Sequence, residues 1–280
     1  MKRRSTIAVG VDGSWAGNGA VDWALHESEL TAAPIRAVHV IDDRPPLGAY
    51  FNFPGADAAA RALVGEVCAY LDHHDRPGLH TGLVLCGPPA HTLAGATGGD
   101  RMLVVGRQGR SVLGRLLIGS TAEAAAHESR TAVVVVPPRW RPGDPQAPVV
   151  VGVDRPDRWA AAVDFAARFA AERDASIQLV HVCKTITHDE AVEDARRRLD
   201  EILGRCRDEH PGTTFRPELR RGHPVAALTA AAIEVNAQLL VVGGHPHGRV
   251  ASTVLSGTAH GVLQHAPCPA AIVHQPERPH

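Results

Sequence analysis

Short apolar runs alternate along the chain with segments that have helical periodicity. In the first half the runs are IAVGV, IRAVHV, MLVVG and AVVVV, at residues 7–11, 35–40, 102–106 and 132–136. They are continuous rather than alternating, which is typical of parallel strands covered on both faces. Between them, Leu63, Val67 and Leu71 recur every four residues, as on the buried side of a helix. The pattern predicts a doubly wound α/β sheet with helices on both faces.

The second half of the chain repeats the first. Five blocks recur in the same order: 7–15 with 149–159, 35–40 with 177–182, 87–97 with 222–232, 101–106 with 238–244, and 127–138 with 265–276. Asp154 follows Asp12 by 142 positions and Gly257 follows Gly119 by 138, so small length changes separate the copies. We therefore expect two domains of one fold, at residues 1–140 and 147–280. The proline-rich segment 137–148 is expected to be a linker.

Composition narrows the classes of partner. The formal net charge is −1, so no overall field favours nucleic acid or an anionic membrane, and we expect neither partner. No apolar run approaches the roughly 18 residues of a membrane span. The five cysteines are dispersed, which is typical of reduced thiols in a cytoplasmic protein. Lys2 and Lys184 are the only lysines, so a bound anion would be met by arginine, backbone amides or helix ends.

The stretch VVGRQGRSVLGRLLIGST, residues 104–121, has the features of an anion-binding loop. An apolar strand ends at Gly106, and Gly109 lets successive amides point into one concavity. Gly119 then precedes a good helix former, so an anion can reach the first amides of that helix, and Ser120 or Thr121 can cap it. Four or five hydrogen bonds to a charged ligand would contribute about 6–10 kcal/mol before ordering costs, which suggests micromolar affinity.

Other interpretations of the same residues stay open. The glycines could serve only turns and a helix cap. A P-loop is excluded because Ser120 stands where its lysine belongs, and a dinucleotide fingerprint is weak because Asp22 occupies its third glycine position.

The 17 histidines form no recognisable ligand set, so we expect no metal site. We also expect no catalytic residue, and we expect His39 and His181, at equivalent strand positions, to be structural.

The motif G-x-x-G-x(9)-G-[ST], between a VVG strand and a helix, resembles that of the universal stress protein family in its ATP-binding branch. VGVDGS, IRAVHV and the GPPA segment are similar too, and the resemblance covers nearly the whole chain twice, as in tandem-domain members from actinobacteria. It implies two Rossmann-like domains, each with a mainly parallel five-stranded sheet. It also implies ATP as ligand, with Mg²⁺ as a candidate companion, and a nucleotide-dependent regulator of stress or dormancy responses.

The resemblance assigns roles in the first copy. Asp12 resembles the carboxylate near adenine or ribose, and Val40 resembles the backbone contact to adenine. The remaining residues flank Asp12 or line the ribose and phosphates: Gly10, Val11, Gly106, Arg107, Gly109, Arg110, Gly119, Ser120 and Thr121. The corresponding candidates in the second copy are Gly152, Asp154, Val182, Gly243, Gly244, Gly248, Gly257 and Thr258.

The second copy departs from the motif in its stretch VVGGHPHGRVASTVLSGT. Gly257 follows Gly243 by 14 positions, whereas Gly119 follows Gly106 by 13. Depending on the alignment, His247 or Pro246 stands at the position of Gly109. Proline has no N–H, and histidine resists positive φ. The second copy is therefore either a site of altered shape or a vestigial loop.

Two further expectations concern assembly and alternative functions. The resemblance implies that the final strands pair edge to edge, giving a homodimer or a pseudo-dimer of the two domains, and it implies a protein partner of unknown identity. The alternatives to a regulator are an enzyme that uses adenine nucleotides, by adenylyl transfer or slow ATP hydrolysis, and a structural scaffold.

Overall fold

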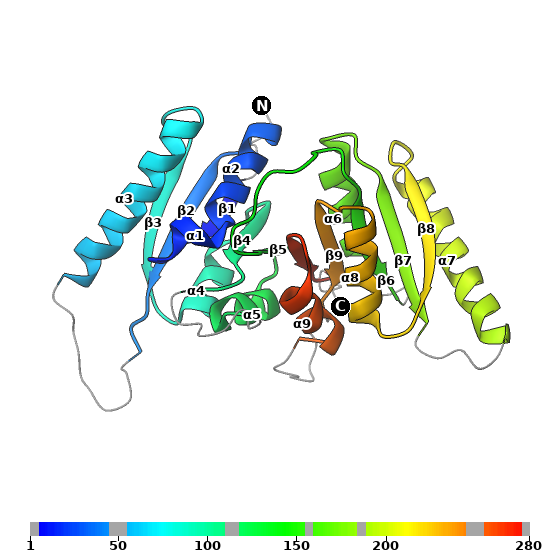
Figure 1. Ribbon diagram of the computed structural model, residues 1–280. Helices are drawn as coiled ribbons and strands as arrows, with labels where there is room; N and C mark the ends of the chain where they lie inside the picture. The colour runs from blue at the N-terminus through cyan, green and yellow to red at the C-terminus, as the bar shows by residue number, and fades with distance from the viewer. Residues whose placement is uncertain are drawn as a thin grey trace, which may run out of the picture. The chain divides into compact units, whose positions relative to one another are not determined.

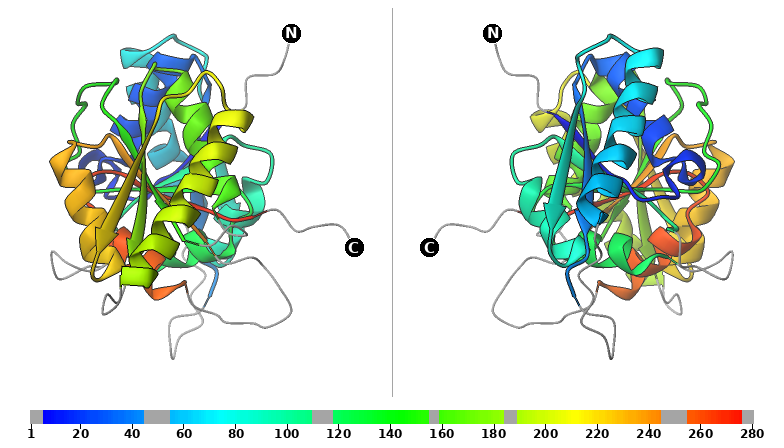
Figure 2. Two further views of the ribbon diagram at one scale, coloured as in Figure 1. Left: turned by 90° about the vertical axis from the view of Figure 1, so that its right-hand side faces the viewer. Right: turned by 90° about the vertical axis from the view of Figure 1, so that its left-hand side faces the viewer.

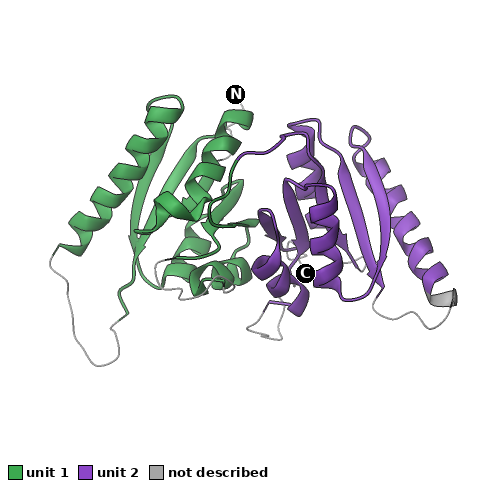
Figure 3. Cartoon of the chain, in the orientation of Figure 1, with its two compact units in different colours: residues 1–141 green, residues 142–280 purple. Residues whose placement is uncertain are grey.

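The computed structural model describes residues 6–44, 55–109, 118–154, 159–183, 189–244 and 255–275. The chain divides into two compact units, residues 1–141 and 142–280 (Figure 3). Each unit is built from parallel strands and helices, so the predicted α/β class with two tandem domains is confirmed. Within the described ranges, no helix combines the length and the apolar character that a membrane crossing requires.

The first unit alternates strands and helices (Figure 1). Its elements are β1 (Ile7–Gly10), α1 (Trp15–Asn18), α2 (Ala20–Thr31), β2 (Ile35–Ile41), α3 (Ala56–His74), β3 (Thr81–Cys86), α4 (Pro89–Ala96), β4 (Met102–Gly106), α5 (Ser120–Glu128) and β5 (Val133–Val136). The strands lie in the order β3-β2-β1-β4-β5, and every pair is parallel. The chain therefore reverses its direction of travel between β1 and β4, which makes that point the topological switch point.

The second unit repeats this plan. Its elements are β6 (Val149–Val153), α6 (Ala160–Ala171), β7 (Ile177–Cys183), α7 (Asp189–Glu209), β8 (Phe215–Arg221), α8 (Pro224–Glu234), β9 (Leu239–Gly243), α9 (Gly257–His265) and β10 (Ala270–Val273). The strand order is β8-β7-β6-β9-β10, again parallel throughout. Figure 2 shows helices on both sides of the strands. Several strands are apolar on both faces, as expected for a sheet covered by helices on both sides: the first four residues of β4 and of β9 are buried, and so are all four residues of β5 and of β10.

Strand register corrects one block of the sequence alignment. Val133 pairs with Leu103, and Ala270 pairs with Leu240, so the copies are offset by 137 positions here. The sequence comparison of 127–138 with 265–276 used an offset of 138 and is wrong by one residue. The error arose because HESR and HAPC both begin with histidine, although the hydrogen-bonded ladder aligns β5 with β10 one position away.

The predicted linker, residues 137–148, is held at both ends. In the first unit the ring of Trp140 lies 5.6 Å from that of His26. In the second unit Gln238 Nε2 donates hydrogen bonds to the carbonyl oxygens of Pro145, at 2.8 Å, and Ala147. These contacts attach Trp140 to the first unit and Pro145 and Ala147 to the second, so the segment is not a free spacer.

One buried histidine of the first unit leads to a prediction about pH. The side chain of His80 is fully buried, its Nδ1 accepts a hydrogen bond from the Ile35 amide at 3.2 Å, and its Nε2 lies 3.4 Å from Asp75 Oδ2. Burial lowers the pKa of His80 below 6.5, while the charges of Asp75 and Asp72 oppose that shift. A proton on Nδ1 would also meet the Ile35 N–H, so the geometry favours the neutral ring.

We expect the free energy of unfolding of the first unit to fall as the pH drops below about 6.5. The unfolded histidine binds a proton there, whereas the buried ring resists protonation, so acid favours the unfolded state. Urea unfolding between pH 7.5 and 5 measures this loss. The control is His80→Phe, which introduces the residue found at the aligned position, Phe215. In this variant the free energy of unfolding should change less with pH than in the wild type. Identical slopes in both proteins would contradict the prediction.

Candidate functional site

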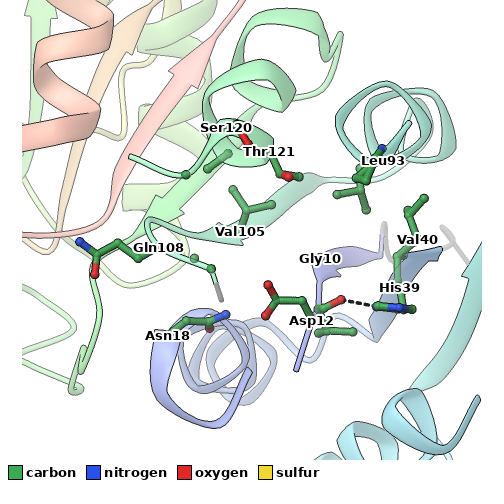
Figure 4. A pocket seen from close by; sticks show the side chains of 17 residues that line it. Gly10, Asp12, Asn18, His39, Val40, Leu93, Val105, Gln108, Ser120 and Thr121 are labelled. Carbon is green, nitrogen blue, oxygen red and sulfur yellow. Dashed lines mark hydrogen bonds between the residues drawn. The ribbon is translucent and has the colours of Figure 1, made fainter. Parts of the chain in front are cut away.

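A pocket of about 240 Å³ lies at the carboxyl ends of β1, β2 and β4 in the first unit (Figure 4). This is the switch point of the sheet, where open α/β sheets bind ligands. Arg107 is not among the lining residues, and Arg110 is outside the described part of the chain. The other residues predicted for the first copy all line this pocket: Gly10, Val11, Asp12, Val40, Gly106, Gly109, Gly119, Ser120 and Thr121.

The floor of the pocket, formed by Gly10, Leu93 and Val105, is apolar and closely packed. A Cβ added to Gly10 would lie 3.2 Å from Val105 Cγ1 and 3.3 Å from Leu93 Cδ1. Val38 and Val40 of β2 continue this apolar surface. Such a surface suits a flat, weakly polar ring rather than a charged group.

Asp12 is the carboxylate of this pocket, and its two oxygens differ in their surroundings. Oδ1 accepts hydrogen bonds from the Ser14 amide, at 2.8 Å, and from the Ser14 hydroxyl. Oδ2 faces Gly109, where an added Cβ would lie only 2.9 Å away. A side chain at position 109 would therefore displace the Asp12 carboxylate, which its hydrogen bonds with Ser14 hold at the mouth of the pocket.

His39 holds the end of β1 in place. Its Nδ1–H donates to the Val11 carbonyl oxygen at 2.8 Å, and His181 makes the same bond to Val153 at 2.9 Å in the second unit. The structural role expected for His39 and His181 is therefore the same hydrogen bond in both units. In the first unit the His39 side chain also lines the pocket.

The N-terminus of α5 closes the opposite side of the pocket. Gly119 is the N-cap, with extended φ and ψ of −66° and 140°, and its carbonyl accepts the first helical hydrogen bond from Glu123. The prediction that Ser120 or Thr121 caps this helix is therefore wrong. Both residues lie inside the first turn, and Gly119 has no side chain that could accept from the first amides of the helix. The first amides of any α-helix have no hydrogen-bond acceptor within that helix. That helix end can meet an anion.

Arg107 contributes to the loop through its backbone. Its N–H donates to the Val136 carbonyl oxygen at 2.8 Å, and its own carbonyl accepts from the Gly119 amide at 2.7 Å. The second bond joins the end of β4 to the start of α5. This closure brings Gly109 and Gly119 to the same side of the pocket.

Sequence reasoning missed several lining residues. Asn18 is 7% exposed, and its side chain lies so close to Gly106 that an added Cβ there would be 2.7 Å from it. Its Oδ1 accepts a hydrogen bond from the Ala20 amide at 3.0 Å. The sequence signal for this residue was an asparagine placed just before a helical pattern, where its side chain can accept from the backbone at the start of the helix. The other missed residues are Val38, Pro89, Leu93, Val105, Gln108 and Ala122.

The second unit keeps the same kind of floor. A Cβ on Gly152 would lie 3.1 Å from Leu228 Cδ1 and 3.2 Å from Val242 Cγ1, which matches the packing over Gly10. Among the other predicted residues, Asp154 is exposed just after β6, Val182 lies in β7, Gly243 ends β9, and Gly257 and Thr258 begin α9. Gly244 packs against the ring of His274, where an added Cβ would be 2.3 Å away. Gly248 lies outside the described residues.

The N-terminus of the last helix differs between the units. In the second unit the N-cap is Ser256, and its hydroxyl accepts a hydrogen bond from the Ala259 amide at 3.1 Å. Ser256, not Gly257, therefore matches Gly119, and the sequence alignment was wrong by one position here too. With this correction, Ser256 follows Gly243 by 13 positions, as Gly119 follows Gly106. Pro246 is then the residue of the second copy that aligns with Gly109.

Comparison with known proteins agrees with the duplicated architecture. The family model of the universal stress protein family matches residues 3–137 and again 147–274. A universal stress protein from Mycolicibacterium smegmatis is 31% identical over 294 residues, which cover 95% of this chain and 96% of that protein. The universal stress protein Rv1996 of Mycobacterium tuberculosis is 24% identical, covering 98% and 96% of the two chains.

A solved structure extends the similarity to the whole fold. The crystal structure of a universal stress protein from Archaeoglobus fulgidus has a TM-score of 0.77 at 18% identity, and the match covers 99% of this chain and 100% of that chain. Because the family model matches both halves and a relative aligns along almost its full length, the chain belongs to the universal stress protein family as a tandem of two domains.

Proposed function

We propose that the first unit binds ATP in its pocket and that the chain acts as a nucleotide-dependent regulator in a stress or dormancy response. One observation carries the proposal: the switch point of the sheet places an apolar floor, a fixed carboxylate and an open helix N-terminus around a single pocket. These are the three surfaces that a base, a ribose and a chain of phosphates would need. The regulatory role follows the family to which the chain belongs.

Different residues of the pocket contact the base, the ribose and the phosphates of the proposed nucleotide. Leu93 and Val105 pack on one face of the base, and the backbone at Val40 meets its edge. Asp12 Oδ2 accepts from a ribose hydroxyl. Gly109 and the first turn of α5 give amides to the phosphates, and the Ser120 and Thr121 hydroxyls add donors there. The bound phosphates supply the negative charge that this helix end favours.

We further propose that one nucleotide binds per chain. In the second unit the Ser256 hydroxyl already accepts from the Ala259 amide, the third of α9. The matching residue in the first unit, Ala122, lines the pocket instead. Pro246, at the position of Gly109, removes another donor. Both changes take amides away from an anion in the second unit.

Isothermal titration of the full-length chain with Mg·ATP tests this function. We expect about one site per chain with a micromolar dissociation constant, because four or five charged hydrogen bonds offset by ordering costs lead to that range. Absence of binding at millimolar ATP would contradict nucleotide binding itself. Two equal sites per chain would contradict only the proposed difference between the units.

Regulation rather than turnover is the proposed outcome of binding. No lysine is present among the pocket residues, and the carboxylate there, Asp12, is held by Ser14, so any hydrolysis of ATP would be slow. Contacts with the nucleotide change the surface around the pocket mouth, and a protein partner in the cytosol would recognise that change. Steady release of AMP or ADP at rates above one per minute would favour the enzymatic alternative.

A further inference from the structure

Three side chains with metal-ligating groups meet at the C-terminal end of α7 in the second unit. Asp164 comes from α6, Glu209 is the last residue of α7, and His210 follows it. One ligand atom from each lies within 4.8 Å of the other two. Asp164 Oδ1 and His210 Nε2 are 2.9 Å apart. The side chains are 44%, 45% and 21% exposed respectively, so an ion from solvent can reach them.

The backbone around the cluster places it at a favourable point for a cation. The His210 amide donates to the Cys206 carbonyl oxygen at 2.9 Å, which continues the last turn of α7. The C-terminus of a helix carries partial negative charge, and two carboxylates add to it. Arg205 is a cation beside the cluster: its Nη2 is 3.5 Å from Glu209 Oε1, and its guanidinium carbon lies 4.9 Å from the centroid of the Trp159 ring. That exposed pair is weak and can yield Glu209 to an ion.

The first unit provides a natural comparison. Asp22, His74 and Asp75 occupy the aligned positions and offer the same kinds of group. There, however, Tyr70 donates its hydroxyl to Asp22 Oδ1 at 2.8 Å, and Ser28 donates to Asp75 Oδ2 at 2.9 Å. The two carboxylates are thus directed to different partners. Among the residues that the structure describes, only the second unit brings such a group together.

We propose that Asp164, Glu209 and His210 bind a divalent transition cation of the zinc class. An imidazole nitrogen and carboxylate oxygens are each ligand types that Zn²⁺ takes in proteins, and water would complete the coordination. A hard cation such as Mg²⁺ prefers oxygen ligands alone and would bind less well. The bound ion connects α6 to the end of α7 and so stabilises the second unit. It lies outside the nucleotide pocket and does not depend on the function proposed above.

Titration of the chelator-treated full-length chain with ZnCl2, without nucleotide, tests the site. We expect a Zn²⁺ site in the wild-type protein whose affinity falls at least tenfold in His210→Ala and in Glu209→Gln. Glu209→Gln keeps the Asp164–His210 bond, so its fold should be unaffected. His74→Ala, which removes the imidazole at the aligned region of the first unit, should bind as the wild type does. We also expect Zn²⁺ to raise the thermal midpoint of the wild type more than that of His210→Ala.

Each of the following results would overturn the site. One is a wild-type protein that binds no Zn²⁺ below about 100 μM, which is weaker than a three-ligand protein site should be. Another is unchanged affinity in both His210→Ala and Glu209→Gln, because the ion would then be held by other histidines. A loss of equal size in His74→Ala would count against it as well.

Discussion

Replacing Gly109 with valine is expected to lower the affinity for ATP about 100-fold or more. A Cβ at this position would lie 2.9 Å from Asp12 Oδ2, so the carboxylate would have to move. Its other oxygen is held by the Ser14 amide and hydroxyl, which leaves little freedom for that movement. The valine side chain would also occupy part of the space in which we propose that the phosphates bind. A 100-fold loss corresponds to about 2.7 kcal/mol and is measurable by titration calorimetry.

The backbone at Gly109 does not itself demand glycine, because its φ is outside the left-handed region. We therefore expect the variant to fold, with an unchanged circular dichroism spectrum. Gly99→Val is the matched control, since a Cβ there meets no atom within 4 Å and the residue is outside the pocket. It should bind ATP normally. Normal binding by Gly109→Val would show that this glycine is not part of a nucleotide site.

Replacing Arg173 with alanine is expected to lower the free energy of unfolding of the second unit by about 2–4 kcal/mol. Arg173 is 7% exposed, and its guanidinium carbon lies 3.5 Å from the centroid of the Phe169 ring. It donates to the Phe169 carbonyl oxygen at 2.8 Å and to Gln238 Oε1 at 3.2 Å. Its removal takes away these hydrogen bonds, one of them fully buried, and the cation–π contact, which together lead to this range.

Urea unfolding followed by far-UV circular dichroism measures the loss, and Arg168→Ala is the control because Arg168 is exposed on the preceding helix. Arg173→Lys should not restore stability, since a lysine cannot both stack on Phe169 and reach two acceptors. Gln238 also fixes the linker at Pro145 and Ala147, so the variant should be cleaved faster there by a protease. Loss of less than 0.5 kcal/mol would contradict this account.

The fold was predictable because strands buried on both faces are continuous apolar runs, and because two copies of the same pattern support each other. The pocket was predictable where residues of one sequence motif line it, as Gly106, Gly109 and Gly119 do. Leu93 and Asn18 were missed because they belong to helices whose approach to β1 and β4 depends on tertiary packing. The N-cap of α5 was predicted at Ser120 or Thr121 instead of Gly119, and Gly257 was aligned with Gly119 although Ser256 matches it. Serine and glycine both favour the N-cap position, and only backbone hydrogen bonds decide which residue is the cap.

Each unit has an apolar pocket floor of the same kind, and this similarity bears on how such a chain can evolve after gene duplication. Leucine and valine side chains cover a strand glycine in both units, at Gly10 and at Gly152, as part of the apolar packing of each sheet. The residues that differ, such as Gly119 and Ser256, lie at the rim, where a substitution costs the fold little. One copy can therefore lose or change its ligand while purifying selection on stability alone preserves the floor beneath it. In a copy that had lost its ligand, such a floor would reflect common ancestry and not present use.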